Sequence, residues 1–245
     1  DYGRFIAKLV AKFLVKTAFT PVHVTLLFFI TGLAAIYFML NGQYFTALIL
    51  LILKSIIDAA DGELARLREK PSYIGRYLDS NLDLILNFGF LYTIHYITNS
   101  SFLLMFLAFI AMQLQGTVFN YYYIILRNSS QGGDTTSRIE ENSFPKALHG
   151  ENQQLVNILF VIYTIFYGGF DRIIIALDRS AQKSAHLPNW FMTFVSIYGL
   201  GFQLLIIGLM LAFGFINHII PFMICYSIFI VILIGIRKLF LVETT

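Results

Sequence analysis

Cysteine and charge are both scarce in this sequence. Only one of the 245 residues is a cysteine, Cys225, and a single thiol excludes an intramolecular disulfide framework or a metal site built from several thiolates. Charged residues make up 13% of the chain and leave a formal net charge of +3. A charge this small and this unevenly placed does not indicate a nucleic-acid-binding protein.

Apolar residues, in contrast, are abundant. They form 58% of the chain, with a mean hydropathy of +0.73, whereas soluble domains contain about 45–50% apolar residues. The excess lies in blocks of roughly 20 residues, enough to cross about 30 Å of hydrocarbon as a helix. We therefore expect an all-α integral membrane protein. No cleavable signal peptide is expected in it, and a start at Asp1 instead of Met leaves open whether residues precede it.

The first 19 residues differ from the rest. Their basic residues recur every four positions between apolar ones, which predicts an amphipathic helix on an anionic leaflet or, alternatively, a solvated cap on the bundle. The basic residues are Arg4, Lys8, Lys12 and Lys16. Pro21 ends this segment, and residues 20–245 are expected to form a single transmembrane domain.

Seven apolar blocks follow, and they predict a bundle of about six transmembrane helices, with a seventh left open. If all seven crossed, Arg237 and Lys238 would lie outside, against the tendency of cations to remain in the cytoplasm. The fifth block is interrupted by Gly168-Gly169 and Asp171-Arg172, which leaves open that it bends or crosses only in part. The blocks lie at about 22–40, 43–66, 75–97, 102–126, 153–177, 191–215 and 218–240.

The distribution of cations also predicts the orientation. The turns at 41–43 and 98–101 contain no Lys or Arg, so by the positive-inside rule they face away from the cytoplasm. The opposite ends of the same helices carry Arg66, Arg68, Lys70, Arg76 and Arg127.

Four aspartates at this cytoplasmic end predict a functional site. Asp58 and Asp61 share one face of a helix, and Asp79 and Asp83 share one face of the next, because residues three or four apart are neighbours. Unpaired carboxylates near a bilayer are costly. Four of them in one pocket would repel each other unless divalent ions lay between them. We therefore expect a metal site at the membrane surface.

Written out, the stretch reads Asp58-x2-Asp61-Gly62-x2-Ala65-Arg66, eight residues, then Gly75-x3-Asp79-x3-Asp83. It resembles the signature of the CDP-alcohol phosphotransferases (CDP-alcohol phosphatidyltransferases), with every defining position present. One departure is Pro21-Val22-His23-Val24-Thr25, where many members carry Pro-Asn before a Thr. The resemblance implies a phospholipid-synthesising enzyme that is a homodimer. It also implies that Asp58, Asp61 and Asp79 are metal ligands, and that Asp83 is the general base and a further ligand.

The residues themselves suit this chemistry. Two Mg²⁺ or Mn²⁺ ions on carboxylates could clamp the pyrophosphate of a CDP-linked substrate. Gly62, Ala65 and Gly75 would leave space for the CDP moiety, and Arg66 could bind phosphate. Two simpler interpretations are open: the glycines serve helix packing, or the first two aspartates pair with Arg66 or Arg68.

Four further residues are candidates for contact with the acceptor or a phosphate: Arg127, Arg138, Lys146 and Glu151. The three cations are equally well explained as topology determinants. Glu151 follows Gly150 in a stretch that loosely resembles one in the aminoalcohol branch of the family.

The leading hypothesis is transfer of a substituted phosphoryl group to an alcohol with release of CMP. CDP-diacylglycerol is the favoured donor. The alternative is a CDP-choline or CDP-ethanolamine phosphotransferase that acts on diacylglycerol. A transporter with buried acids is a distant alternative, since its acids should lie near the bilayer midplane.

Overall fold

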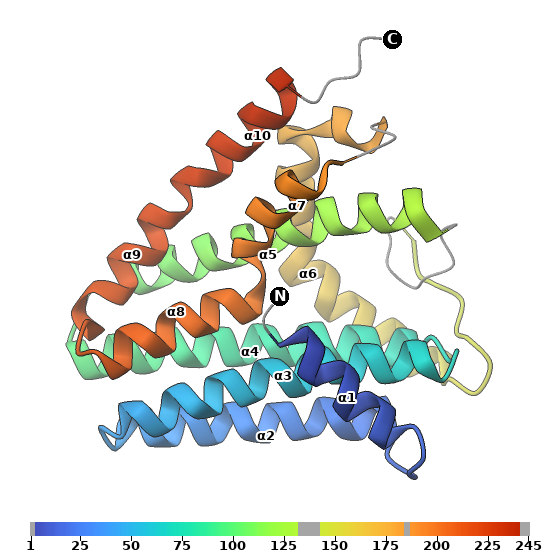
Figure 1. Cartoon of the computed structure of the whole chain (residues 1–245), viewed down its shortest axis with the longest axis horizontal. Helices are drawn as coiled ribbons and strands as arrows, with labels where there is room; N and C mark the ends of the chain where they lie inside the picture. The colour runs from blue at the N-terminus through green and yellow to red at the C-terminus, as the bar shows by residue number, and fades with distance from the viewer. Residues whose placement is uncertain (1–2, 132–142, 184–186, 241–245) are drawn as a thin grey trace.

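The computed structural model of this chain describes residues 3–131, 143–183 and 187–240, and within them every regular element is a helix (Figure 1). The predicted all-α class is therefore confirmed. The α-helices are α1 (Arg4–Leu14), α2 (Pro21–Leu40), α3 (Tyr44–Leu67), α4 (Tyr73–Thr98), α5 (Phe102–Gln131), α6 (Gln153–Leu177), α7 (Asn189–Val195), α8 (Leu200–Ala212), α9 (Ile219–Tyr226) and α10 (Ile228–Phe240). Short 3₁₀ turns occupy Arg179–Lys183, Ser196–Tyr198 and Ile216–His218.

The first five expected blocks are helices with nearly the predicted bounds, and the expected interruption of the fifth is wrong, because α6 runs unbroken through Gly168-Gly169 and Asp171-Arg172. Helix α2 begins at Pro21, whose missing N–H costs nothing in the first turn, and the Thr20 hydroxyl accepts a hydrogen bond from the His23 amide. The turn between α2 and α3 places Gly42 at φ +71°, a left-handed conformation that favours glycine. Helices α2 and α3 consequently lie side by side, with α4 packed against α2 (Figure 1).

The sixth expected block is bent, and the seventh is one span with a local interruption between α9 and α10. Helix α8 is bent by 51° from the preceding helical segment, which ends at Tyr198, and α9 ends at Tyr226 before α10 begins. The two breaks are joined by tyrosines: the Tyr198 hydroxyl donates to the Tyr226 carbonyl at 3.0 Å, and the Tyr226 hydroxyl donates to the Ile197 carbonyl at 3.2 Å. Carbonyls freed from helical bonding thus find partners in the protein, as burial in a membrane requires.

The chain is an integral multi-pass membrane protein. Among the described residues, four helices are long and apolar enough to cross a bilayer: Pro21–Leu40, Phe102–Asn128, Gln153–Leu177 and Ile216–Leu239. If the bent pair Asn189–Tyr198 and Leu200–Ala212 is counted as one further span, the number of candidate spans rises to five. Helices α3 and α4 have 24 and 26 residues and are long enough to cross as well, but they carry the charged motif. The number of about six spans stays a prediction.

Helix α1 packs on α3 through small residues. Ala7 and Ala11 are fully buried against Ala60 and Leu64. Larger apolar side chains of α1 point outward, and Phe13 is 74% exposed. The helix ends at Leu14, earlier than the predicted residue 19, and there Arg68 donates to the carbonyls of Leu14 and Thr17. Contact of α1 with a lipid leaflet stays a prediction.

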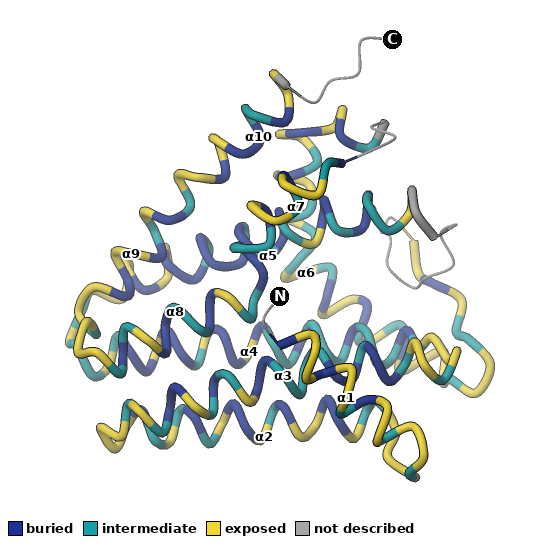
Figure 2. The backbone as a smooth tube through the Cα atoms, viewed as in Figure 1, coloured by how far each residue is buried: buried dark blue, intermediate teal, exposed yellow. Residues whose placement is uncertain are grey.

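The main core lies between α2, α3, α4, α5, α8 and α9, and the inward faces of these helices are buried (Figure 2). Two glycines permit close packing: a Cβ on Gly32 would lie 2.5 Å from Leu86 Cδ1, and one on Gly208 would lie 2.6 Å from Leu48 Cδ1. Hydrogen bonds between helices also cross this interior. The Gln115 amide donates to the Met223 carbonyl at 2.9 Å, so this glutamine is bonded within one chain.

A buried ion pair ties α10 to the rest. Asp178 follows α6, and its carboxylate accepts from the Arg237 guanidinium and from the Tyr122 hydroxyl, the latter at 2.6 Å. Both charged side chains are essentially fully buried. Arg237 is therefore neutralised by a partner, and its charge is no guide to the side of the membrane on which α10 ends.

Candidate active site

The four motif aspartates come together from two helices. Asp58 and Asp61 lie near the end of α3, and Asp79 and Asp83 lie in the first half of α4. Helix α6 also packs on α4, and the Tyr167 hydroxyl donates to the Ser80 carbonyl at 2.9 Å. This bond ties α6 to the part of α4 that carries Asp79 and Asp83.

Three of these carboxylates are close enough to share one ion. Asp58, Asp61 and Asp79 each offer an oxygen within 4.8 Å of those of the other two. Asp79 Oδ1 is buried and accepts no hydrogen bond from the described residues. A buried oxygen without a partner is costly, and hard Mg²⁺ or Mn²⁺ ions bind such oxygens. The donor set therefore fits a divalent ion.

A residue of α2 positions Asp61. The Thr25 hydroxyl lies 2.6 Å from Asp61 Oδ2 and donates to it. Both side chains are buried. The sequence gave no direct signal for this contact across 36 positions, although Thr25 ends the stretch in which the chain departs from the family pattern.

Lys54 is the functional candidate that sequence reasoning missed. Its ammonium donates to Asp58 Oδ2 at 2.8 Å and to Asp83 Oδ1. The side chain is 0% exposed and packs over the Phe28 ring, 4.5 Å from its centroid. A signal was present: a lysine inside an apolar block, four residues before an aspartate, lies on the same helix face as that aspartate.

The motif glycines do not face a neighbouring helix closely. A Cβ on Gly62 would meet only the Arg66 guanidinium of the same helix, at 3.7 Å, and one on Gly75 would meet Ser72, at 3.3 Å. Ser72 caps α4 by accepting from the Gly75 amide. The helix-packing interpretation is therefore unsupported at Gly62, and space for a CDP moiety beside Gly62, Ala65 and Gly75 stays a prediction.

Cations gather around Glu63, two residues after Asp61. Arg66 pairs with Glu63 at 3.0 Å, and Arg4 of α1 approaches Glu63 at 3.5 Å. Burial opposes its charge, yet the neighbouring Tyr123 and Glu63 raise the pKa of Arg4. Arg127 lies within electrostatic range of both Arg4 and Arg66. Phosphate binding by Arg66 or Arg127 stays a prediction.

The remaining candidates lie elsewhere. Glu151 caps α4, since one carboxylate oxygen accepts from the Ser72 hydroxyl and the Ile74 amide and the other from the Leu148 amide. Its contact with an acceptor stays a prediction. Lys146 is exposed in the segment before α6. Arg138 lies outside the described residues.

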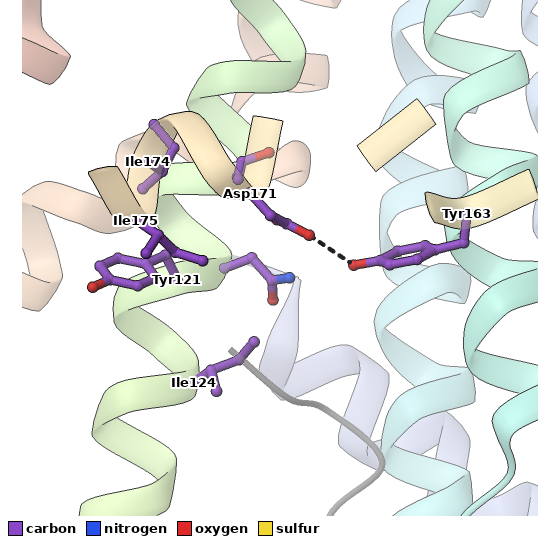
Figure 3. Close-up of a pocket in the computed structure, with 8 residues that line it drawn as sticks. Tyr121, Ile124, Tyr163, Asp171, Ile174 and Ile175 are labelled. Carbon is purple, nitrogen blue, oxygen red and sulfur yellow. Dashed lines mark hydrogen bonds between the residues drawn. The ribbon is translucent and has the colours of Figure 1, made fainter. Parts of the chain in front are cut away.

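A separate pocket lies between α5 and α6 (Figure 3). Asp171 and Tyr163 point toward each other across it, and the Tyr163 hydroxyl donates to Asp171 Oδ2 at 3.4 Å. Tyr121, Ile124 and Ile174 also line it. None of the four motif aspartates lines this pocket, so it is distinct from the carboxylate cluster.

Fold and site together define a multi-pass membrane protein with a carboxylate cluster, suited to a divalent ion, between two of its helices. The chain belongs to the CDP-alcohol phosphatidyltransferase family, whose profile matches residues 18–216. The family predicted from the motif is thereby confirmed. Its members are phosphotransferases and generally depend on divalent metal ions.

One curated relative is the "Inner membrane protein YnjF" of Escherichia coli (strain K12), which is 38% identical over 80 residues. The match covers 31% of this chain and 38% of that relative, so the chain spans well under half of the length of the protein that it matches. No solved structure matches the chain significantly.

Proposed function

We propose that this protein transfers a substituted phosphoryl group from a CDP-linked donor to an alcohol and releases CMP, with Mg²⁺ or Mn²⁺ as its metal. The observation that carries the proposal is the convergence of Asp58, Asp61 and Asp79, with an unsatisfied oxygen on Asp79, in a chain of this family. These three residues would hold the ion. When bound, the ion would neutralise the charge of the pyrophosphate.

Asp83 is the proposed general base. The acceptor hydroxyl oxygen forms a bond to the phosphorus attached to the lipid or alcohol group, the bond from that phosphorus to CMP breaks, and the hydroxyl proton passes to Asp83. The role needs a carboxylate near the metal ligands, and Asp83 lies one helical turn after Asp79. Lys54 orients its Oδ1.

CDP-diacylglycerol is the favoured donor, with a polar alcohol as acceptor. The stretch around Glu151 loosely resembles the aminoalcohol branch, which would favour the other donor class. Both carboxylate oxygens of Glu151, however, already accept hydrogen bonds at the start of α4 and in its flanking loop, so this likeness is weak support for that class. The alternative of a CDP-choline or CDP-ethanolamine donor and a diacylglycerol acceptor is an outcome of the test below.

The cation distribution supports a site that faces the cytoplasm, where nucleotide-activated substrates are found. A homodimer is implied by the family resemblance and would be tested by cross-linking in native membranes. The motif disfavours a transporter, because Asp61 and Asp79 lie in the halves of α3 and α4 next to the α3–α4 connection, which carries Arg68.

The test is CMP release by the full chain purified in detergent, with radiolabelled CDP-diacylglycerol and a panel of polar alcohols, or with CDP-choline and diacylglycerol. Chelation by EDTA should abolish release, and Mg²⁺ or Mn²⁺ should restore it. Asp79→Ala should lower the rate at least about 100-fold, since a catalytic metal supplies several kcal/mol and each 1.4 kcal/mol is tenfold.

Glu69→Ala, the same acid-to-alanine exchange at an exposed residue of the α3–α4 connection, is the matched control and should retain full activity. Metal-dependent release of CMP from neither donor class, by a protein that unfolds cooperatively, would overturn the proposal.

A further inference from the structure

The Lys54 ammonium lies between the carboxylates of Asp58 and Asp83 and donates to both. We infer that Lys54 is a built-in substitute for one of the two ions expected at this motif, so that the protein holds a single divalent ion on Asp58, Asp61 and Asp79 while Lys54 secures Asp83. This inference rests on the proposed metal-dependent function, and it replaces the two expected ions by one ion and one ammonium group.

The first support is the position of the ammonium group. A second ion that joined Asp83 to Asp58 would need the space between these two carboxylates. Lys54 Nζ is already there, 2.8 Å from Asp58 Oδ2 and hydrogen-bonded to Asp83 Oδ1. Divalent ions sit about 2.0–2.6 Å from carboxylate oxygens, so an ion on these two oxygens would be in direct contact with a positive charge.

The second support is the burial of Lys54. Its side chain is 0% exposed, and its ammonium stacks on the Phe28 ring. Phe28 and the neighbouring Leu51 belong to the apolar core, with no exposed surface. A displaced ammonium would therefore enter an apolar region without a counter-ion, at a cost of several kcal/mol. Lys54 is consequently a permanent part of the site.

The third support is the division among the carboxylates themselves. The three that converge on a shared point are Asp58, Asp61 and Asp79, and Asp83 is the one outside that group. Asp79 has the unsatisfied oxygen, whereas Asp83 already has a cation. Lys54 thus acts as a positioning residue that leaves Asp83 to serve as a base and not as a ligand.

The experiment counts bound Mn²⁺ per chain on the full protein in detergent, by equilibrium dialysis with elemental analysis and by electron paramagnetic resonance. The wild-type protein should bind one ion, with the spectrum of an isolated Mn²⁺. Lys54→Met should bind two and show the spin coupling of a close pair. Lys238→Met, the same exchange at an exposed position of α10, should bind one.

A double variant guards against misfolding of Lys54→Met, which leaves Asp58 and Asp83 without their cation. Lys54→Met/Asp83→Asn removes the ammonium together with one carboxylate charge, and it should fold and bind one ion. Two ions in the wild type, one ion in folded Lys54→Met, or two in the double variant would overturn the inference. Absence of any Mn²⁺ from the wild type would overturn the proposed function as well, so the two failures are distinguishable.

Discussion

Thr25 and Asp61 join the start of α2 to the carboxylate cluster through a hydrogen bond of 2.6 Å between buried groups. The hydroxyl also lies 3.1 Å from the Pro21 carbonyl, but the shorter bond to a charged acceptor is the stronger one. Helix α2 therefore fixes the orientation of a metal-ligand candidate, although it contributes none of the acids.

Replacement of Thr25 by Val keeps the shape of the side chain and removes the donor. A buried acceptor left without a partner costs about 1–3 kcal/mol, so the metal-free protein should melt at a temperature lower by a few degrees, at about 2–4 °C per kcal/mol. Thermal unfolding in detergent with EDTA measures this. Thr25→Ser, which keeps the hydroxyl, should behave like the wild type. Equal melting of both variants would show that the bond contributes nothing.

Asp83→Asn tests the proposed base. An amide cannot take the proton of the acceptor hydroxyl, and a general base contributes about 10²–10⁴ to a rate, so turnover should fall by that factor. CDP binding, measured by isothermal titration calorimetry, should be retained because Asp58, Asp61 and Asp79 remain. Near-native turnover in this variant would assign the proton transfer to another group.

Substitution by Leu should affect the melting temperature differently at Gly62 and at Gly208. A side chain at Gly62 has space, and Leu favours a helix by up to about 1 kcal/mol relative to Gly. Gly62→Leu should therefore melt no lower than the wild type, yet weaken CDP binding at least about tenfold, equivalent to 1.4 kcal/mol. Retained CDP affinity in Gly62→Leu would place the nucleotide elsewhere.

Gly208→Leu is the converse case. Its Cβ would collide with Leu48 of α3, including the backbone Cα at 3.3 Å. Overpacking of this kind costs about 1–3 kcal/mol, so the variant should melt lower.

The buried pair of Arg237 and Asp178 should be essential to the docking of α10. Arg237→Met leaves Asp178 buried with only neutral partners, and loss of one member of a buried pair costs about 3–5 kcal/mol. A clear drop in melting temperature is expected. Lys238→Met next to it is the control, and Arg237→Met/Asp178→Leu should recover much of the loss. No drop in the single variant would mean that α10 is held by its apolar contacts alone.

Much of this protein could be predicted from local sequence. The blocks that became α2 to α6 were recognisable by length and apolarity, and the turn at Gly42 by its polar residues. The breaks before α8 and α10 were not, because they are accompanied by bonds between distant segments, from the Tyr198 hydroxyl to the Tyr226 carbonyl and from the Tyr226 hydroxyl to the Ile197 carbonyl. Interior tyrosines look alike in sequence whether they face lipid or bond to a distant backbone.

The charged residues show the same division between what local sequence determines and what helix packing determines. Asp58 and Asp61 had to share a helix face, as did Asp79 and Asp83, because helical periodicity acts over three or four residues and requires no tertiary information. The sequence by itself therefore determined the membrane class, the acidic motif and the family to which it points.

Only the packing of the helices decided which groups would meet. Lys54 could have paired with Asp58 alone, and its bond to Asp83 exists because α3 and α4 bring the two side chains together. Thr25 reaches Asp61, and Arg237 reaches Asp178, for the same reason. Contacts between residues 29 to 59 positions apart follow from the arrangement of whole helices, which local periodicity does not specify.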